Sequence, residues 1–125
     1  MKLLYKEEVY DIIGACYEVY NELHCGLAEP IYQEALEIEF KIRNIPYERE
    51  VPLEVYYKGE RLHKRYIADF VCYDDIIIEL KAVDAITNDH VAQILNYLKI
   101  TKSPLGILVN FGNKRKLEWS RYINL

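Results

Sequence analysis

The stretch that decides the fold reads IADFVCYDDIIIELKAV over residues 67–83. Asp74-Asp75 marks a tight turn between two predicted strands. Glu79 and Lys81 are two residues apart on the second strand, so their side chains point to the same face of the sheet. Two charges on a strand built otherwise from Ile, Leu and Val are costly to bury and need a partner, a metal or a ligand. The opposite face of this strand is predicted to present Ile76, Ile78 and Leu80.

An acidic residue on the first of these strands extends the pattern. Asp69 has apolar neighbours on both sides, and the short turn is expected to bring it beside Glu79. Two carboxylates then converge with the ammonium group of Lys81. Carboxylate oxygens suit Mg²⁺ or Mn²⁺, which activates water and neutralises phosphate charge, while a lysine orients the attacking water or stabilises developing charge. The alternative is a buried ion pair of Lys81 with Glu79 or Asp69 that only holds the sheet together.

The rest of the chain places these strands in a sheet flanked by helices, because apolar residues recur first at helical and then at strand spacing. Gly26 is expected to end the first helix and Pro30 to occupy the first turn of the second. The order αα-βββ-α-β(β) gives an α/β fold with a mixed sheet. The predicted elements are helices at 5–24 and 30–44, strands at 51–57, 63–73 and 76–83, a helix at 85–100, a strand at 105–109 that is buried on both faces beside the 76–83 strand, and a closing edge strand at 117–123. The predicted inner faces are Ile31, Ala35, Ile38 and Ile42 on the second helix, and Val91, Ile94, Leu95 and Leu98 on the third.

Length and composition narrow the class of protein. The 125 residues, 51% of them hydrophobic, suit one domain over residues 1–125. Charges interrupt the first seven residues too soon for a signal peptide, and no apolar run is long enough to cross a bilayer, so we expect a cytoplasmic protein without membrane contact. Three cysteines without a CxxC pair argue against disulfides or a zinc site, and we expect two of them in the core.

Charge is distributed unevenly along the chain. The net charge is -4, but residues 1–60 hold 6 Lys or Arg against 13 Asp or Glu, whereas residues 61–125 hold 10 against 7. A phosphate-facing surface is therefore expected from the second half, although these charges could equally be ordinary solvated surface. Such contacts position a substrate without reading sequence. The candidates for contacts with a nucleic-acid backbone are Lys99, Lys102, Lys114, Arg115, Lys116 and Arg121.

Four short motifs together resemble a known family. Asp69 followed by Glu79-Leu80-Lys81 resembles the D…(D/E)xK core of the PD-(D/E)XK nuclease superfamily, with Ala68 where proline is usual. Three further segments also resemble family motifs. They are QILNY at 93–97, which resembles the QxxxY element of the RecB-like branch, GLAEPIY at 26–32, which is the motif that names the GxxExxY protein family, and NFG at 110–112, which resembles the segment after that family's last core strand.

The resemblance implies a restriction-endonuclease-like core, α-βββ-α-β, with an extra N-terminal helix. It implies that Asp69 and Glu79 are metal ligands, that Lys81 is the catalytic lysine and that Glu29 reaches the metal. Gln93 and Tyr97 are implied to lie beside the site, where they contact the substrate backbone or position Lys81. Other interpretations remain open for several residues. Glu29 could instead interact with the helix dipole, and Glu34 would then be the acid of this helix that reaches the metal. Core packing is open for Tyr32 and Tyr97, and a surface position for His90.

The function expected from these residues is a Mg²⁺- or Mn²⁺-dependent nuclease, with DNA as the expected substrate. Whether it is an endonuclease or an exonuclease is left open by the sequence, as is RNA in place of DNA. One alternative is a catalytically silent module of the same fold that binds nucleic acid or a protein partner. A homodimer is compatible with both interpretations.

Overall fold

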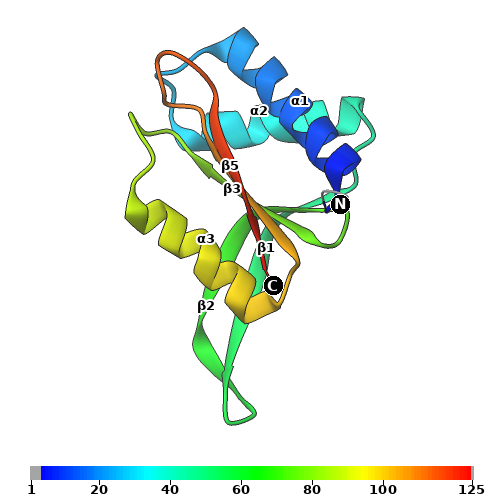
Figure 1. Ribbon diagram of the computed structural model, residues 1–125, viewed down its shortest axis with the longest axis vertical. Helices are drawn as coiled ribbons and strands as arrows, with labels where there is room; N and C mark the ends of the chain where they lie inside the picture. The colour runs from blue at the N-terminus through cyan, green and yellow to red at the C-terminus, as the bar shows by residue number, and fades with distance from the viewer. Residues whose placement is uncertain (1–3, 125) are drawn as a thin grey trace.

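The computed structural model describes residues 4–124 and confirms the predicted order of elements (Figure 1). The strands form one sheet in the order β1-β2-β3-β4-β5, and β3 and β4 are the parallel pair that α3 connects. A parallel pair requires such a crossover, whereas antiparallel neighbours need only turns. The elements are α1 (Lys6–Leu23), α2 (Glu29–Ile42), β1 (Tyr47–Tyr57), β2 (Glu60–Cys72), β3 (Ile76–Lys81), α3 (Asn88–Thr101), β4 (Leu105–Asn110) and β5 (Glu118–Ile123).

The connection between α1 and α2 differs in detail from the prediction. Helix α1 ends at Leu23, and it is capped not by Gly26 but by His24, which has a positive φ of 59°. Gly26 takes a φ of 107° in the loop that follows. Pro30 lies in the first turn of α2, as predicted, because its missing N–H has no helical partner there.

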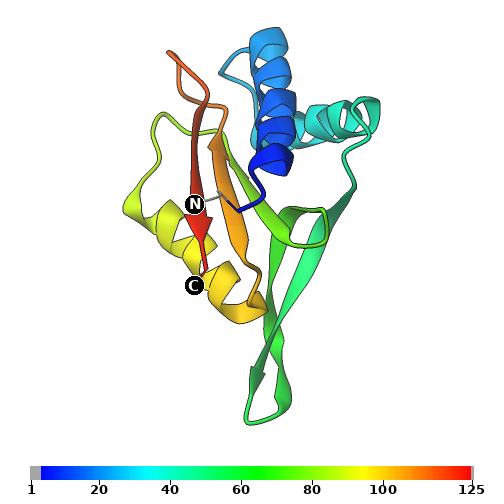
Figure 2. The ribbon, with the colours of Figure 1, turned by 45° about the vertical axis from the view of Figure 1, so that its right-hand side comes forward.

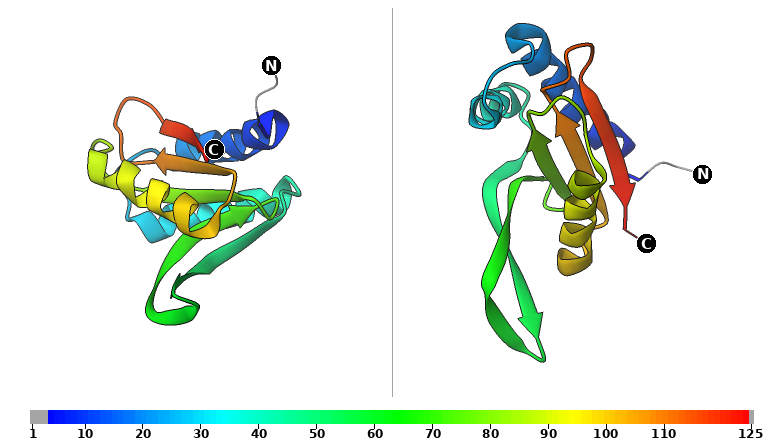
Figure 3. Two further views of the ribbon diagram at one scale, coloured as in Figure 1. Left: turned by 60° about the horizontal axis from the view of Figure 1, so that its bottom comes forward. Right: turned by 90° about the vertical axis from the view of Figure 1, so that its left-hand side faces the viewer.

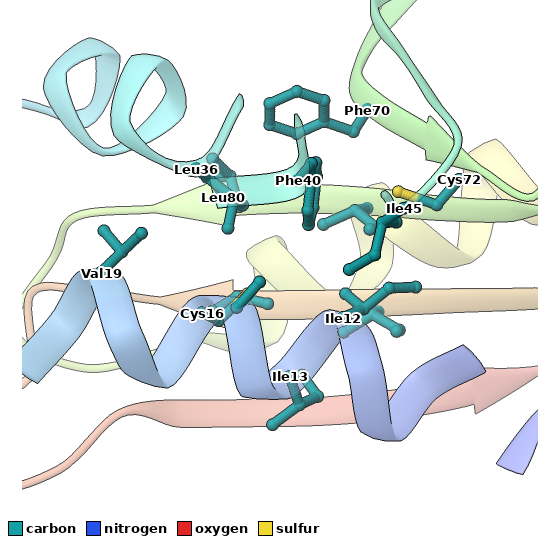
Figure 4. Close-up of a cluster of buried hydrophobic side chains, with 14 of the residues drawn as sticks. Ile12, Ile13, Cys16, Val19, Leu36, Phe40, Ile45, Phe70, Cys72 and Leu80 are labelled. Carbon is teal, nitrogen blue, oxygen red and sulfur yellow. The ribbon is translucent and has the colours of Figure 1, made fainter. Parts of the chain in front are cut away.

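Two hydrophobic clusters cover the two faces of the sheet, with α1 and α2 on one side and α3 on the other (Figure 3). In the larger, α1 and α2 pack on the face that carries Ile76, Ile78 and Leu80, which is the orientation predicted for these three residues. Figure 4 shows Cys16 of α1 and Leu36 of α2 on this side. The smaller cluster lies under α3 and consists of Leu53, Ala68, Ile77, Tyr97 and Leu98.

The predicted inner face of α2 is wrong by one position. Ile31, Ile38 and Ile42 are exposed by 47%, 57% and 66%. Tyr32 and Phe40 are fully buried instead. The helical period fits both stripes, and the aromatic stripe is the one buried because its rings remove more apolar area from water.

Helix α3 shows a smaller error of the same kind. Ile94 and Leu98 are buried as predicted and Val91 is half-buried, but Leu95 is 46% exposed. Tyr97 takes the inner position that had been expected for Leu95.

Strands β3 and β4 lie side by side as predicted, although β3 ends at Lys81, two residues before its predicted end. All six residues of β4 are buried, and β4 pairs in parallel with β3 from Ile76 opposite Leu105 to Lys81 opposite Asn110. Burial on both faces explains the continuous apolar run. Strand β5 covers the far edge of β4, as expected for a closing strand.

Strands β1 and β2 extend well beyond the rest of the sheet (Figures 1 and 2). Both are longer than predicted, beginning at Tyr47 and Glu60. Their far end, residues 54–66, is mostly solvent-exposed, and we call it the arm.

Cys16 and Cys72 are buried as predicted, Cys25 is half-buried, and the three are free thiols. Within residues 4–124, no helix combines the length and the apolar composition that crossing a membrane requires.

Candidate active site

Asp69 and Glu79 lie where the β2–β3 ladder ends. Regular pairing stops at Phe70 opposite Ile78, so the same register places Asp69 opposite Glu79. The backbone N–H of Asp69 donates to Glu79 Oε1 at 3.0 Å, and the N–H of Leu80 donates to Asp69 Oδ2 at 2.7 Å. Each carboxylate thus binds the backbone of the opposite strand in place of a ladder bond, and the two acids are neighbours, as the sequence predicted.

Burial and mutual repulsion set the electrostatics of these acids. Glu79 is only 4% exposed, and burial followed by the charge of Asp69 raises its pKa to about 8. Burial also raises the pKa of Asp69, against the opposing effects of the Leu80 N–H and Lys81. For Glu29, burial and then the charge of Asp69 raise the pKa. Glu29, Asp69, Glu79 and Lys81 therefore share one electrostatic environment, in which added positive charge favours the ionised carboxylates.

Lys81 is held by a neutral partner and not by the carboxylates. Its Nζ donates to Gln93 Oε1 at 2.8 Å, and Gln93 Nε2 donates to the Tyr97 hydroxyl at 2.9 Å. The ion pairs found within residues 4–124 do not include Lys81. The sheet-stabilising ion pair of Lys81 with Glu79 or Asp69 is therefore not formed among these residues.

Tyr97 belongs to the core. Its side chain is 3% exposed, and its ring packs on Tyr66 with centroids 5.3 Å apart. Burial, with the charge of Glu79 as the second cause, raises its pKa to about 12. This placement agrees with the core interpretation of Tyr97 and leaves Gln93 as the residue that contacts Lys81.

The Gly26–Tyr32 segment is fastened by its tyrosine. The Tyr32 hydroxyl donates to the backbone oxygen of His24 and accepts from the Leu27 N–H at 3.1 Å. Its ring stacks on Phe111, with centroids 4.8 Å apart and planes 8° from parallel. The segment therefore presents Glu29, the first residue of α2, to the site, and Tyr32 has the predicted core role.

The Asn110-Phe111-Gly112 segment braces the chain after Lys81. Asn110 accepts from the Val83 N–H at 3.0 Å and donates to the Val83 oxygen at 2.8 Å. A Cβ atom on Gly112 would come within 2.3 Å of the Val83 oxygen, so only glycine fits there. The Gly26–Tyr32 and Asn110–Gly112 motifs thus hold the backbone around the site in place.

The structure adds Gln33 and Glu50, which the sequence analysis missed. Gln33 is 8% exposed, and its Nε2 donates to the Asp69 backbone oxygen at 3.4 Å. It follows Glu29 by four residues and so shares its helix face, which is a signal the sequence offered. Glu50 lies opposite Asp69 in the β1–β2 register and its charge raises the pKa of Asp69. That position depends on strand register, which the sequence did not reveal.

The predicted backbone-binding residues separate into two groups. Lys114, Arg115 and Lys116 are exposed in the loop after β4, at the end of the sheet where Lys81 pairs with Asn110. Lys99 and Lys102 lie at the C-terminal end of α3, before β4 begins. Since β4 runs between the two groups, they occupy opposite ends of the sheet. Arg121 instead donates to the Leu4 backbone oxygen.

The two remaining alternatives also have a place in the structure. Glu34 is exposed, whereas Glu29 is among the charges that raise the pKa of Glu79. His90 Nδ1 accepts from the Thr87 N–H at 3.0 Å as part of the α3 cap, so it has a structural role near the surface.

The carboxylate oxygens of Glu29, Asp69 and Glu79 are the candidate donors to a divalent metal. In the part of the chain that the structure describes, no three His, Cys, Asp or Glu side chains are gathered closely enough to enclose an ion. Glu29, Asp69 and Glu79 thus do not form a ready three-carboxylate cage. The hydrogen bonds above occupy one oxygen of Asp69 and one of Glu79, and their second oxygens are of the type that Mg²⁺ and Mn²⁺ prefer. A cation would also relieve the repulsion that raises the pKa of Glu79, so the donor chemistry fits a metal.

A cavity of about 720 Å³ lies away from these residues, between α1 and β5. Tyr17, Arg43 and Trp119 contribute to its walls, and the carboxylates do not.

Comparison with known proteins identifies the family of this chain and a similar fold. A family model described as the PD-(D/E)XK nuclease superfamily matches residues 6–122. No curated protein matches the chain. Among solved structures, the crystal structure of SSO0001 is similar, with 24% sequence identity and a TM-score of 0.59 over 76% of this chain and 49% of SSO0001. This chain spans about half the length of SSO0001, and at this identity the likeness shows the fold alone.

Proposed function

Since this chain belongs to the PD-(D/E)XK nuclease superfamily, we propose that it is a divalent-metal-dependent nuclease that hydrolyses phosphodiester bonds in DNA. Asp69 and Glu79 are its proposed metal ligands and Lys81 its proposed catalytic lysine. The observation that carries the proposal is the junction of β2 and β3, where the buried carboxylate of Glu79 and the half-buried carboxylate of Asp69 are neighbours beside a lysine that forms an ion pair with neither.

The side chains have complementary roles in this proposal. Asp69 and Glu79 each keep one carboxylate oxygen for the metal, and Glu29 approaches from α2 as a further donor. A bound Mg²⁺ or Mn²⁺ supplies positive charge that makes water a better nucleophile and neutralises the phosphate. Lys81 Nζ, held by Gln93, donates to the attacking water or to the phosphate oxygen on which negative charge develops.

Membership in the GxxExxY branch is part of the same proposal. Its support is the Gly26–Tyr32 segment, in which Tyr32 anchors the loop that presents Glu29. The single-domain interpretation of residues 1–125 is likewise kept as a proposal.

A cleavage assay with Mg²⁺ or Mn²⁺ on single-stranded, duplex and branched DNA tests the activity. We expect Asp69→Ala and Lys81→Ala to lower the cleavage rate at least ~100-fold, because each removes a group acting at the reacting phosphate. Glu34→Ala and Lys41→Ala, which truncate exposed residues of the same types on α2, serve as matched controls and should cleave at the wild-type rate. Wild-type cleavage no faster than that of Asp69→Ala would refute the proposal.

Thermal melting tests metal binding independently of cleavage. Mn²⁺ should raise the melting temperature of the wild type, because an ion that binds only the native state stabilises it by mass action. The rise should disappear in Asp69→Asn. An equal rise in both proteins would place the metal elsewhere.

A catalytically silent nucleic-acid-binding module is the second candidate. It is favoured by the lack, within residues 4–124, of a preformed cluster of three metal-binding side chains. DNA binding that survives Glu79→Ala, together with no metal-dependent cleavage by the wild type, would support it.

A further inference from the structure

The arm is exposed on both sides along much of its length (Figure 2). In β2, every residue from Glu60 to Ile67 is exposed. A two-stranded ribbon that meets solvent on both faces adds little to stability. The length of the arm is therefore better explained by contact with another molecule than by core formation.

Exposed tyrosines lie along the arm. Tyr56, Tyr57 and Tyr66 are 60%, 64% and 42% exposed. Large apolar groups gathered at a surface usually mark an interaction site. A tyrosine ring in particular offers a flat face on which an unpaired base stacks.

The arm is also positively charged, although the whole chain has a net charge of -4. Residues 58–65 contain four basic residues and one acidic residue, a net charge of +3. Arg61 forms an ion pair with Glu54 at 3.3 Å. Lys64 and Arg65 instead help to line a cavity of about 450 Å³ between the arm and the end of α3. The other residues around this cavity are Val55, Leu62, Tyr66 and Ile100.

The candidate active site does not supply comparable attraction for phosphate. Without counting Glu79, whose burial disfavours its charged form, the acids Glu29 and Asp69 already outnumber Lys81, so without metal the site offers no net positive charge to a phosphate backbone. Attraction must come from a neighbouring positive surface. Lys99 and Lys102 are also exposed near Ile100, the α3 residue that lines the cavity beside the arm.

A continuous chain of contacts joins the arm to the site. The Tyr66 ring at the base of the arm packs on Tyr97, whose hydroxyl accepts from Gln93. Gln93 in turn accepts from Lys81 Nζ. A strand lying along the arm would therefore reach the same side of the sheet as Lys81.

We propose that the arm binds an unpaired strand of nucleic acid. Lys64 and Arg65 neutralise its phosphates, and Tyr56 and Tyr57 stack on its bases, with one residue of each pair on either face of the ribbon as the strand wraps around it. The proposal rests on the proposed nuclease function for where the bound strand leads, but binding itself requires no cleavage.

Fluorescence anisotropy with a labelled oligothymidylate, in EDTA so that metal-dependent cleavage is prevented, tests the proposal. Lys64→Glu/Arg65→Glu should bind at least ~10-fold more weakly, with a salt dependence lowered by about 1.4, since each phosphate contact on a single strand contributes about 0.7. Tyr56→Ala/Tyr57→Ala removes two stacking rings and should bind at least ~30-fold more weakly. Its salt dependence should be unchanged, because stacking releases no counterions. These side chains are exposed, so the variants should melt like the wild type.

Lys6→Glu/Lys41→Glu makes the same charge change on α1 and α2 and should keep wild-type affinity. Arm variants that bind as tightly as this control, or a wild type that does not bind the oligonucleotide, would overturn the proposal. Tighter binding of a duplex, unaffected by the tyrosine changes, would also overturn it. If the wild type binds through the arm but does not cleave, the nuclease proposal is refuted and the arm proposal stands. If cleavage depends on Lys81 but the arm variants keep wild-type affinity, the arm proposal is refuted and the nuclease proposal stands.

Discussion

The two faces of β3 differ in the polarity of the side chains that they carry. On one face, Ile76, Ile78 and Leu80 are fully buried against α1 and α2. On the other, Ile77 is equally buried under α3, but Glu79 and Lys81 follow it at the same spacing. One short strand therefore completes a hydrophobic core and also carries the charged groups of the candidate site.

The difference shows how the same burial acts oppositely on the two faces. Burying an Ile or Leu side chain stabilises the fold by about 1.5–3 kcal/mol. Burial of Glu79 opposes folding with the carboxylate ionised, and it raises the pKa of that group. The apolar face thus holds in place an acid that would be destabilising on its own. Strongly shifted carboxylates of this kind are frequent at functional sites.

The largest effect is expected from the apolar face. Ile78→Ala should lower the free energy of unfolding by about 2–5 kcal/mol, because it leaves a cavity in a fully buried position. Ile38→Ala is the matched control, since Ile38 is 57% exposed on α2, and should change stability by less than about 0.5 kcal/mol. Urea unfolding measures both. Equal losses would mean that α2 buries the stripe first predicted for it.

A smaller effect is expected from Glu79 and depends on pH. The folded pKa of about 8 lies above the ordinary value of 4.5, so the folded state binds more protons than the unfolded state between these values. The stabilisation that Glu79 contributes is then fully present below about pH 4.5 and is lost as the pH rises through 8. The free energy of unfolding should therefore fall by roughly 2 kcal/mol between pH 5 and pH 7. Urea unfolding in EDTA across this range measures the fall.

Glu79→Gln should remove most of this pH dependence, because the amide does not ionise. A weaker fall in the same direction should remain from Asp69, whose pKa is also raised. Parallel pH profiles for the wild type and Glu79→Gln would show that Glu79 is not the group responsible.

The smallest effect is expected from Gln93, which positions Lys81. Gln93→Ala removes the acceptor of Lys81 Nζ and should lower kcat about tenfold with little change in KM, within the range for loss of precise positioning. Asn96→Ala, at an exposed position of the same helix, should leave both unchanged. A rise in KM alone would make Gln93 a substrate-binding residue instead.

The sequence predicted the faces of β3 better than it predicted the faces of the helices. Glu79 and Lys81 were placed on one face correctly because strand alternation has a fixed period of two. The α2 stripe was misplaced because two helical stripes, one residue apart, were both apolar, and only packing against Phe70 and Phe111 selected Tyr32 and Phe40. Glu50 was missed because its place opposite Asp69 depends on the β1–β2 register.

The arm is a second feature that could be predicted only in part from the sequence. Its tyrosines and basic residues were visible in the sequence, but the strands were predicted to be shorter than they are. Exposure of both faces of a strand is a property of what packs nearby, and the sequence pattern does not report it.

By itself, the sequence determined the order of helices and strands and the face on which Glu79 and Lys81 point, since both follow from local periodicity and turn residues. Only the tertiary structure decided which helix stripe is buried, that Gln93 and not a carboxylate holds Lys81, and that the arm extends into solvent. Those outcomes depend on contacts between residues far apart in the chain, where competing side chains of similar polarity differ only in how well they pack.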